Sequence, residues 1–142
     1  MTSPGLAALA NLARIGKLKA EAPDTRESAN LIRSATVRLH DAGHAALALE
    51  SRFDLAYNAA HAAALAALRM HGYRSENRYL VFQCLEHTLG FTPAQWILLD
   101  QAHKKRNLAE YEGELDITES FAIELLHNVA ALIAAVQKLN VP

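Results

Sequence analysis

The sequence has very little cysteine, which limits the chemistry open to it. Its one cysteine, Cys84, excludes an intrachain disulfide and a zinc site built from several thiolates. Proline and glycine are also scarce, with 4 and 6 residues, and no linker rich in them divides the chain. We therefore expect the 142 residues to form one domain. A short N-terminal helix is expected at about 5–20, and a core at about 25–139.

Neither sign of charge is in excess, since the formal net charge is −1. A protein that binds nucleic acid over a broad surface carries excess lysine and arginine, because they neutralise phosphates. Any such contact here is expected to be local. The sequence has no run of 18 apolar residues and no basic leader followed by an apolar segment. These absences predict a cytoplasmic protein that does not span a membrane.

Residues that favour β-strands are few: valine, isoleucine and threonine together number 17, whereas alanine and leucine are abundant. This composition favours helices. Apolar residues recur at helical spacing, most clearly near the C-terminus at Leu125, Val129, Leu132, Val136 and Leu139. The sequence thus predicts an all-α fold.

Helix starts and stops divide the chain further. Thr92, Pro93 and Gln95 have the spacing of a capping box with proline in the first turn, and Ser75 is the expected cap of the preceding helix. After the first helix, we expect helices at about 25–49, 51–71, 75–89, 92–112 and 116–139. The prediction is a single up-and-down bundle of five or six helices.

Two stretches together resemble a known family. The first runs Arg52-Phe-Asp-Leu-Ala-Tyr-Asn-Ala-Ala-His61 and is followed by Gly72-Tyr-Arg74; the second runs Lys105-Arg-Asn-Leu-Ala-Glu-Tyr-Glu112. In order and spacing they resemble HEPN domains, small helical proteins often encoded beside a minimal nucleotidyltransferase. The resemblance implies a homodimer in which two copies of the arginine motif meet at a cleft.

In the active ribonucleases of that family the motif is arginine, four to six residues, then histidine. Arg106 and Asn107 match its first two positions, but Tyr111 stands where the histidine is expected. Tyrosine titrates near pH 10 and is a poor general base at neutral pH. His103, three residues before Arg106, is the histidine best placed to substitute for it. The candidate catalytic residues are therefore Arg106, Asn107, Tyr111 and His103.

The candidate binding residues are Arg106, Asn107 and Tyr111 with Lys104 and Lys105, which belong to the one dense cationic run. In the structural alternative, the same side chains only pack across the bundle and form a solvated helix face. Another candidate for an anion site is the set Arg69, Arg74 and Arg78 around a predicted turn.

The histidines do not predict a metal site. His40 and His44 have the i, i+4 spacing that can chelate an ion, but spacing places no third ligand, and Asp41 is expected on another part of the helix. His61 is predicted to be a hydrogen-bonded core or interface residue. We expect no metal and no cofactor.

The leading functional prediction is a dimeric, non-catalytic or weakly catalytic HEPN-like protein. It would bind a nucleotidyltransferase partner in trans, a nucleotide or RNA through a cleft at Arg106, in a toxin–antitoxin-like role. The first alternative is a metal-independent HEPN endoribonuclease in which His103 assists Arg106 and Asn107. The second is a helical scaffold without a ligand.

Overall fold

The computed structural model describes residues 3–139. Its elements, in order, are α1 (Pro4–Arg14), β1 (Lys19–Ala20), α2 (Thr25–Ala42), α3 (Leu49–Met70), β2 (Tyr73–Arg74), α4 (Arg78–Gln83), α5 (Leu85–Thr88), α6 (Pro93–Glu112) and α7 (Glu119–Gln137). The predicted all-α bundle is confirmed. Segments α4 and α5 are two short pieces, joined at Cys84, in the place of one predicted helix.

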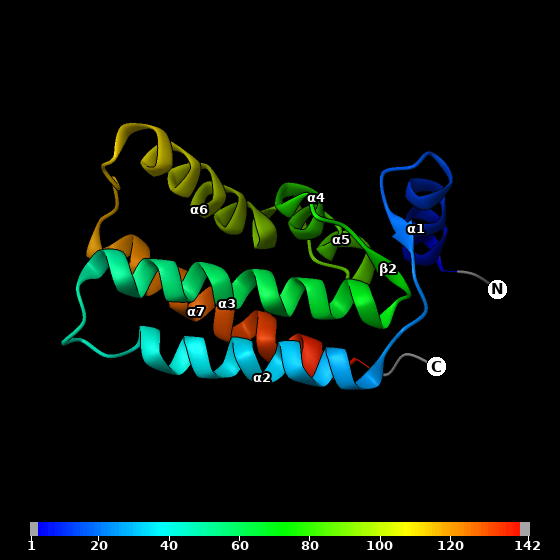
Figure 1. The fold of residues 1–142 in the computed structure, drawn as a ribbon, viewed down its shortest axis with the longest axis horizontal. Coiled ribbons are helices and arrows are strands. Elements are labelled where there is room, and N and C mark those ends of the chain that lie inside the picture. The colour runs from blue at the N-terminus through cyan, green and yellow to red at the C-terminus, as the bar shows by residue number, and fades with distance from the viewer. Residues whose placement is uncertain (1–2, 140–142) are drawn as a thin grey trace.

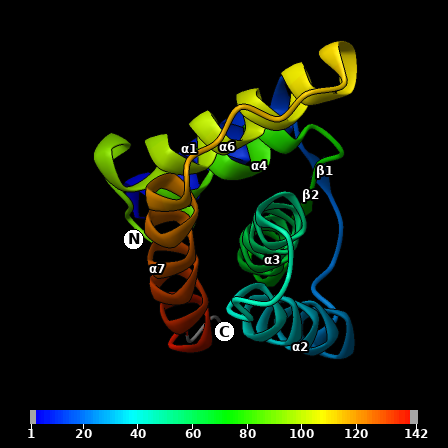
Figure 2. The same ribbon diagram turned by 90° about the vertical axis from the view of Figure 1, so that its left-hand side faces the viewer.

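Helix α3 lies at the centre of the bundle. Helix α2 lies beside it along most of its length (Figure 1). Viewed from the end, α7, α2 and α6 surround α3 on three sides (Figure 2). The short helix α1 packs against α5, near the C-terminal end of α3. Residues placed on different faces of α3 therefore contact different neighbouring helices.

The alanine-rich stretch of α3 forms the core. Its buried alanines, each at most 4% exposed, are Ala56, Ala59, Ala60, Ala62, Ala63, Ala64, Ala66 and Ala67. Small side chains let neighbouring helices approach closely, which explains how α2 and α7 both pack on one helix. The alanine-rich face of α3 is thus covered within the chain, so the predicted dimer requires another surface.

Two helices end earlier than predicted. Helix α1 stops at Arg14, rather than near residue 20, and Gly16 follows with φ of +81°, a conformation that ends a right-handed helix. Helix α2 stops at Ala42, rather than near residue 49. The side chain of Arg52 donates from Nε to the carbonyl oxygen of Ala42 at 3.1 Å and so satisfies a carbonyl left open at the helix end.

The predicted helix start is confirmed at Thr92, whereas the last helix begins after Thr118, two residues beyond the predicted start at 116, and Ser75 is not the cap of α4. Thr92 and Gln95 form a reciprocal capping box, and the Thr118 hydroxyl accepts from the backbone of Phe121. Before α4, the capping residue is Asn77, whose side chain accepts from the backbone N–H of Leu80 at 3.0 Å. The Ser75 hydroxyl instead accepts from the N–H of Asn77 within the turn.

A short antiparallel ribbon, β1 with β2, was not predicted. It pairs Lys19 with Arg74 and Ala20 with Tyr73. Helix α1 docks at this end of the molecule through a close approach, because a Cβ added at Gly5 would collide with the carbonyl oxygen of His87. Only glycine permits that contact without a shift of the backbone.

Helix α7 is the one helix in residues 3–139 that is long and apolar enough to cross a membrane, by length and composition. The core helix of a soluble protein satisfies the same criterion. Four residues of the predicted apolar stripe pack inward, since Leu125, Val129, Leu132 and Val136 are each at most 1% exposed, whereas Leu139 follows the end of α7 and is only half-buried.

Candidate functional site

The candidate site is a group of polar side chains around Tyr57, which is fully buried on α3. The group, hereafter the Tyr57 cluster, consists of Tyr57, Asn58 and His61 from α3, Arg78 from α4, and His103, Arg106 and Asn107 from α6. The three α6 residues share one helix face because they are spaced three and four apart. The cluster therefore depends on how α4 and α6 pack against α3.

His103 connects α6 to Tyr57 by hydrogen bonds. Its Nδ1 lies 2.9 Å from the Tyr57 hydroxyl oxygen, and its Nε2 lies 3.2 Å from Nδ2 of Asn107. With the Asn107 amide donating to Nε2, a neutral imidazole carries its proton on Nδ1 and donates it to the Tyr57 oxygen. The two contacts hold the ring in one orientation, and in this tautomer its lone pair on Nε2 is occupied by the Asn107 amide.

Both cluster histidines favour the neutral form. Burial lowers the pKa of His103, the positive charges of Arg78 and Arg106 lower it further, and Asp100 acts against them. The pKa of His61 falls to about 4, first because of burial and then because of the same two arginines and His103. The arginines therefore produce a positive local potential, which disfavours a further cation and favours an anion.

Two guanidinium groups meet at the Tyr57 ring. The guanidinium carbon of Arg106 lies 5.1 Å from the ring centroid, and that of Arg78 lies 5.4 Å from it, distances typical of cation–π contacts. Arg78 also donates from Nη1 to the side-chain oxygen of Asn58 at 3.3 Å. Within residues 3–139, no carboxylate forms an ion pair with Arg78, so its charge is not neutralised locally.

Arg106 also borders an open cleft of about 280 Å³. The walls carry three carboxylates: Asp54, 3.9 Å from Nε of Arg106, Glu110, 3.2 Å from its Nη1, and Glu50. These acids would repel an anion inside the cleft. The side of Arg106 that shares the Tyr57 ring with Arg78 is therefore better suited to a phosphate.

Three predicted site residues lie apart from the Tyr57 cluster. Tyr111 is 91% exposed and forms no contact with Arg106 or His103 among the interactions of residues 3–139. Lys104 pairs with Asp100 at 3.1 Å. Lys105 donates to the carbonyl oxygen of Asp116 and lies over the Phe121 ring. Lys104 and Lys105 point away from the cluster because neighbouring residues of a helix point in different directions, whereas Tyr111 lies one turn beyond Asn107, at the end of α6.

The predicted anion site at Arg69, Arg74 and Arg78 does not form as one unit. Arg69 is 1% exposed, and Arg74 and Arg69 both bind Glu21 and Glu27. Their charges are thus neutralised by two carboxylates. Of these three arginines, only Arg78 has no carboxylate partner among residues 3–139, and it belongs to the Tyr57 cluster.

Sequence reasoning identified Arg106, Asn107 and His103 but missed Tyr57, Asn58 and the position of both Arg78 and Arg106 at the Tyr57 ring. Tyr57 and Asn58 stand in the first resemblance stretch, which is the one sequence signal that could have drawn attention to them. Cys84 is buried, and burial raises the pKa of its thiol to about 12, so it is not a nucleophile at neutral pH.

The fold and the cluster define an all-α bundle with a positively charged polar site between three helices. No family model matches this sequence, no curated protein matches it, and no solved structure matches it. The resemblance to HEPN domains therefore rests on the sequence motifs alone.

Proposed function

We propose that this protein is a dimeric HEPN-like binding protein of the cytoplasm, with little or no catalytic activity. It binds a nucleotide or RNA through Arg78 and Arg106, in a toxin–antitoxin-like pair with a nucleotidyltransferase supplied in trans. The observation that carries this proposal is the convergence of the two guanidinium groups on Tyr57, with no carboxylate of residues 3–139 paired to Arg78. Guanidinium groups recognise phosphate by charge and by paired hydrogen bonds.

The binding experiment uses a fluorescent single-stranded RNA and, separately, ATP, each titrated with the untagged protein at low salt. Arg78→Ala and Arg106→Ala are each expected to weaken binding roughly tenfold to hundredfold, because each removes a charged donor to phosphate. The matched control is Arg33→Ala, an exposed arginine on α2 whose side chain contacts only Asn30 by hydrogen bond. Lys104→Ala should also leave the affinity within about twofold, since Lys104 lies outside the cluster.

Equal losses in the Arg33 control would show that binding reflects general charge and would contradict a site at the cluster. The absence of binding to both probes at millimolar concentration would remove nucleotide and RNA from the proposal.

The second candidate function is a metal-independent ribonuclease. It is favoured by one observation: His103, not Tyr111, lies within hydrogen-bonding distance of Asn107 and beside Arg106. The same RNA samples, run on a denaturing gel with and without EDTA, test it. We expect wild type to leave the RNA intact. Cleavage that persists in EDTA and is lost in His103→Ala would replace the binding proposal with the ribonuclease alternative.

Dimerisation is a separate prediction, and we propose that the interface is formed by exposed apolar residues of α6 and α7. Ile97 and Ile123 are 50% and 42% exposed, and a groove between the two helices is lined by Ile97, Leu98 and His127. Sedimentation at micromolar concentration should give twice the monomer mass of 15.5 kDa. Ile97→Arg should shift the protein to monomer without loss of helical content, because a charge at an apolar interface is costly. A monomeric wild type at high concentration would contradict the prediction.

A further inference from the structure

The loop that follows α2 brings two histidines and an aspartate together, away from the Tyr57 cluster. His40 and Asp41 belong to the last turn of α2, and His44 follows Gly43, the residue that ends the helix. The backbone tightens here into turns with bonds between residues three apart: the N–H of Gly43 donates to the carbonyl oxygen of His40, and that of His44 donates to the carbonyl oxygen of Asp41. This turn returns the His44 side chain to the end of the helix.

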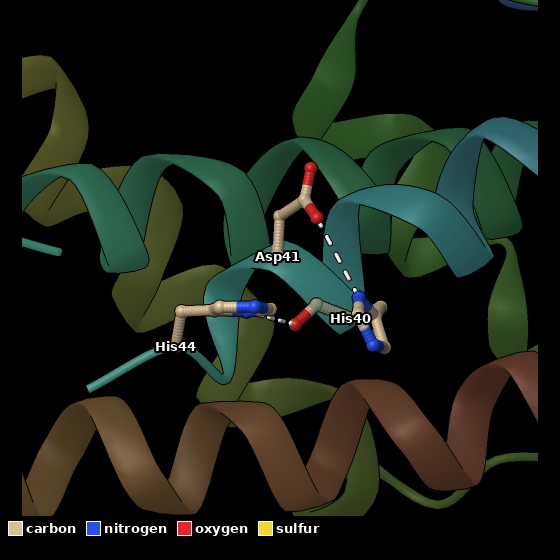
Figure 3. Close-up of side chains that lie close together, drawn as sticks. All are labelled: His40, Asp41 and His44. Atoms are coloured by element: carbon tan, nitrogen blue, oxygen red, sulfur yellow. Dashed lines mark hydrogen bonds and ion pairs between the residues drawn. The ribbon is translucent and has the colours of Figure 1, made fainter. Parts of the chain in front are cut away.

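The three side chains lie close enough to share one ion. One carboxylate oxygen of Asp41 is 3.6 Å from Nδ1 of His40 (Figure 3). The two imidazole centroids are 5.2 Å apart, at an angle of 68°. One potential ligand atom from each residue lies within 4.8 Å of the others. Asp41 therefore lies beside His40, whereas the sequence predicted it on another part of the helix.

A hydrogen bond also orients His44 as a metal ligand. Its Nδ1 lies 3.2 Å from the carbonyl oxygen of His40 (Figure 3). When Nδ1–H donates to that oxygen, the neutral tautomer leaves the Nε2 lone pair free to bind a metal. Metal-binding histidines usually donate their other ring N–H to a carbonyl or carboxylate in this way.

The donor set specifies the class of ion. Two imidazole nitrogens and one carboxylate suit zinc, nickel, cobalt or copper, whereas magnesium and calcium prefer oxygen donors. Ligand bonds to zinc are about 2.0–2.2 Å, so the donors must draw together by roughly 1 Å. All three residues are exposed, and their side chains can make that adjustment without repacking the core.

We propose that His40, Asp41 and His44 bind one divalent transition-metal ion, with zinc or nickel as the best-fitting class. Three protein ligands leave at least one coordination position for water or a further donor. The ion joins the last turn of α2 to the loop before α3. Binding should therefore stabilise the α2–α3 connection, because an ion that binds only the folded state raises its stability.

The test is calorimetric titration of untagged, EDTA-treated protein with zinc chloride and with nickel chloride at pH 7.5. We expect one ion per chain with micromolar affinity and a rise in the midpoint of thermal unfolding. His40→Ala, Asp41→Asn and His44→Ala should each weaken binding about tenfold or more. Replacement by cobalt(II) should give a visible absorption spectrum that each of these variants alters.

The matched control is His127→Ala, an exposed histidine on α7. Circular dichroism checks that every variant stays folded, which is expected because the substituted residues are exposed. Affinity unchanged in the three loop variants, or lost equally in the His127 control, would place metal binding elsewhere and overturn the proposal. So would the lack of binding to wild type below millimolar metal.

Discussion

Replacing Arg69 with methionine is expected to lower the free energy of unfolding by about 3–5 kcal/mol, the range for breaking a buried charged network. Arg69 is the largest fully buried side chain of residues 3–139. From α3 it donates to the carbonyl oxygens of Glu21 and Ala22, at 2.9 and 2.8 Å, and to the Glu27 carboxylate. It thus ties the segment between β1 and α2 to the central helix.

Methionine fills a similar volume but donates no hydrogen bond, so the carbonyl oxygens of Glu21 and Ala22 and the Glu27 carboxylate lose the Arg69 donor. Urea unfolding followed by circular dichroism measures the change. The control is Arg33→Met on the exposed face of α2, which should change stability by no more than about 0.5 kcal/mol. A loss below about 1 kcal/mol for Arg69→Met would mean that this network does not hold the β1–α2 segment.

The same network predicts a dependence of stability on pH. Hydrogen bonds from Arg69 and then Arg74 lower the pKa of Glu27 below 4.5, and a hydrogen bond from Arg74 lowers that of Glu21. Because each carboxylate has a lower pKa in the folded chain, its stabilising contribution is present above about pH 4.5. It is lost as the pH falls through the folded-state value. Arg69→Met should flatten this acid-limb dependence, since it removes the main cause of the Glu27 shift.

Replacing Leu132 with alanine is the second large effect: it should destabilise the protein by about 2–5 kcal/mol. Leu132 is fully buried in the middle of α7, between Val129 and Val136, both also buried. Truncation removes apolar contacts and leaves a cavity that the bundle fills only in part. The alanines of α3, which α7 packs against, are too short to occupy the space.

Denaturant unfolding provides the measurement, with Leu108→Ala as the control. Leu108 makes the same chemical change on α6 but is 54% exposed, so its loss should be small. Similar effects of the two substitutions would contradict the placement of the α7 stripe in the core.

The sequence by itself determined where most helices begin and which residues of α7 face inward. Caps and apolar spacing act within four or five residues, so the capping box of Thr92 with Gln95 and the stripe through Leu132 could be predicted from the sequence alone. The same local logic placed His103, Arg106 and Asn107 on one face of α6. It failed at the end of α2, which stops at Ala42, where Arg52, ten residues on, donates to the last carbonyl oxygen of the helix.

Only the tertiary structure determined which arginines lack a carboxylate partner among residues 3–139. Arg69 and Arg74 meet Glu21 and Glu27 across separations of more than 40 residues, so no local pattern showed that they are neutralised. Arg78 and Arg106 meet at Tyr57 only because α4 and α6 pack on the same helix. The sequence does not show whether an arginine is paired with a carboxylate. That depends on which carboxylates folding brings close to it, and those come from distant parts of the chain.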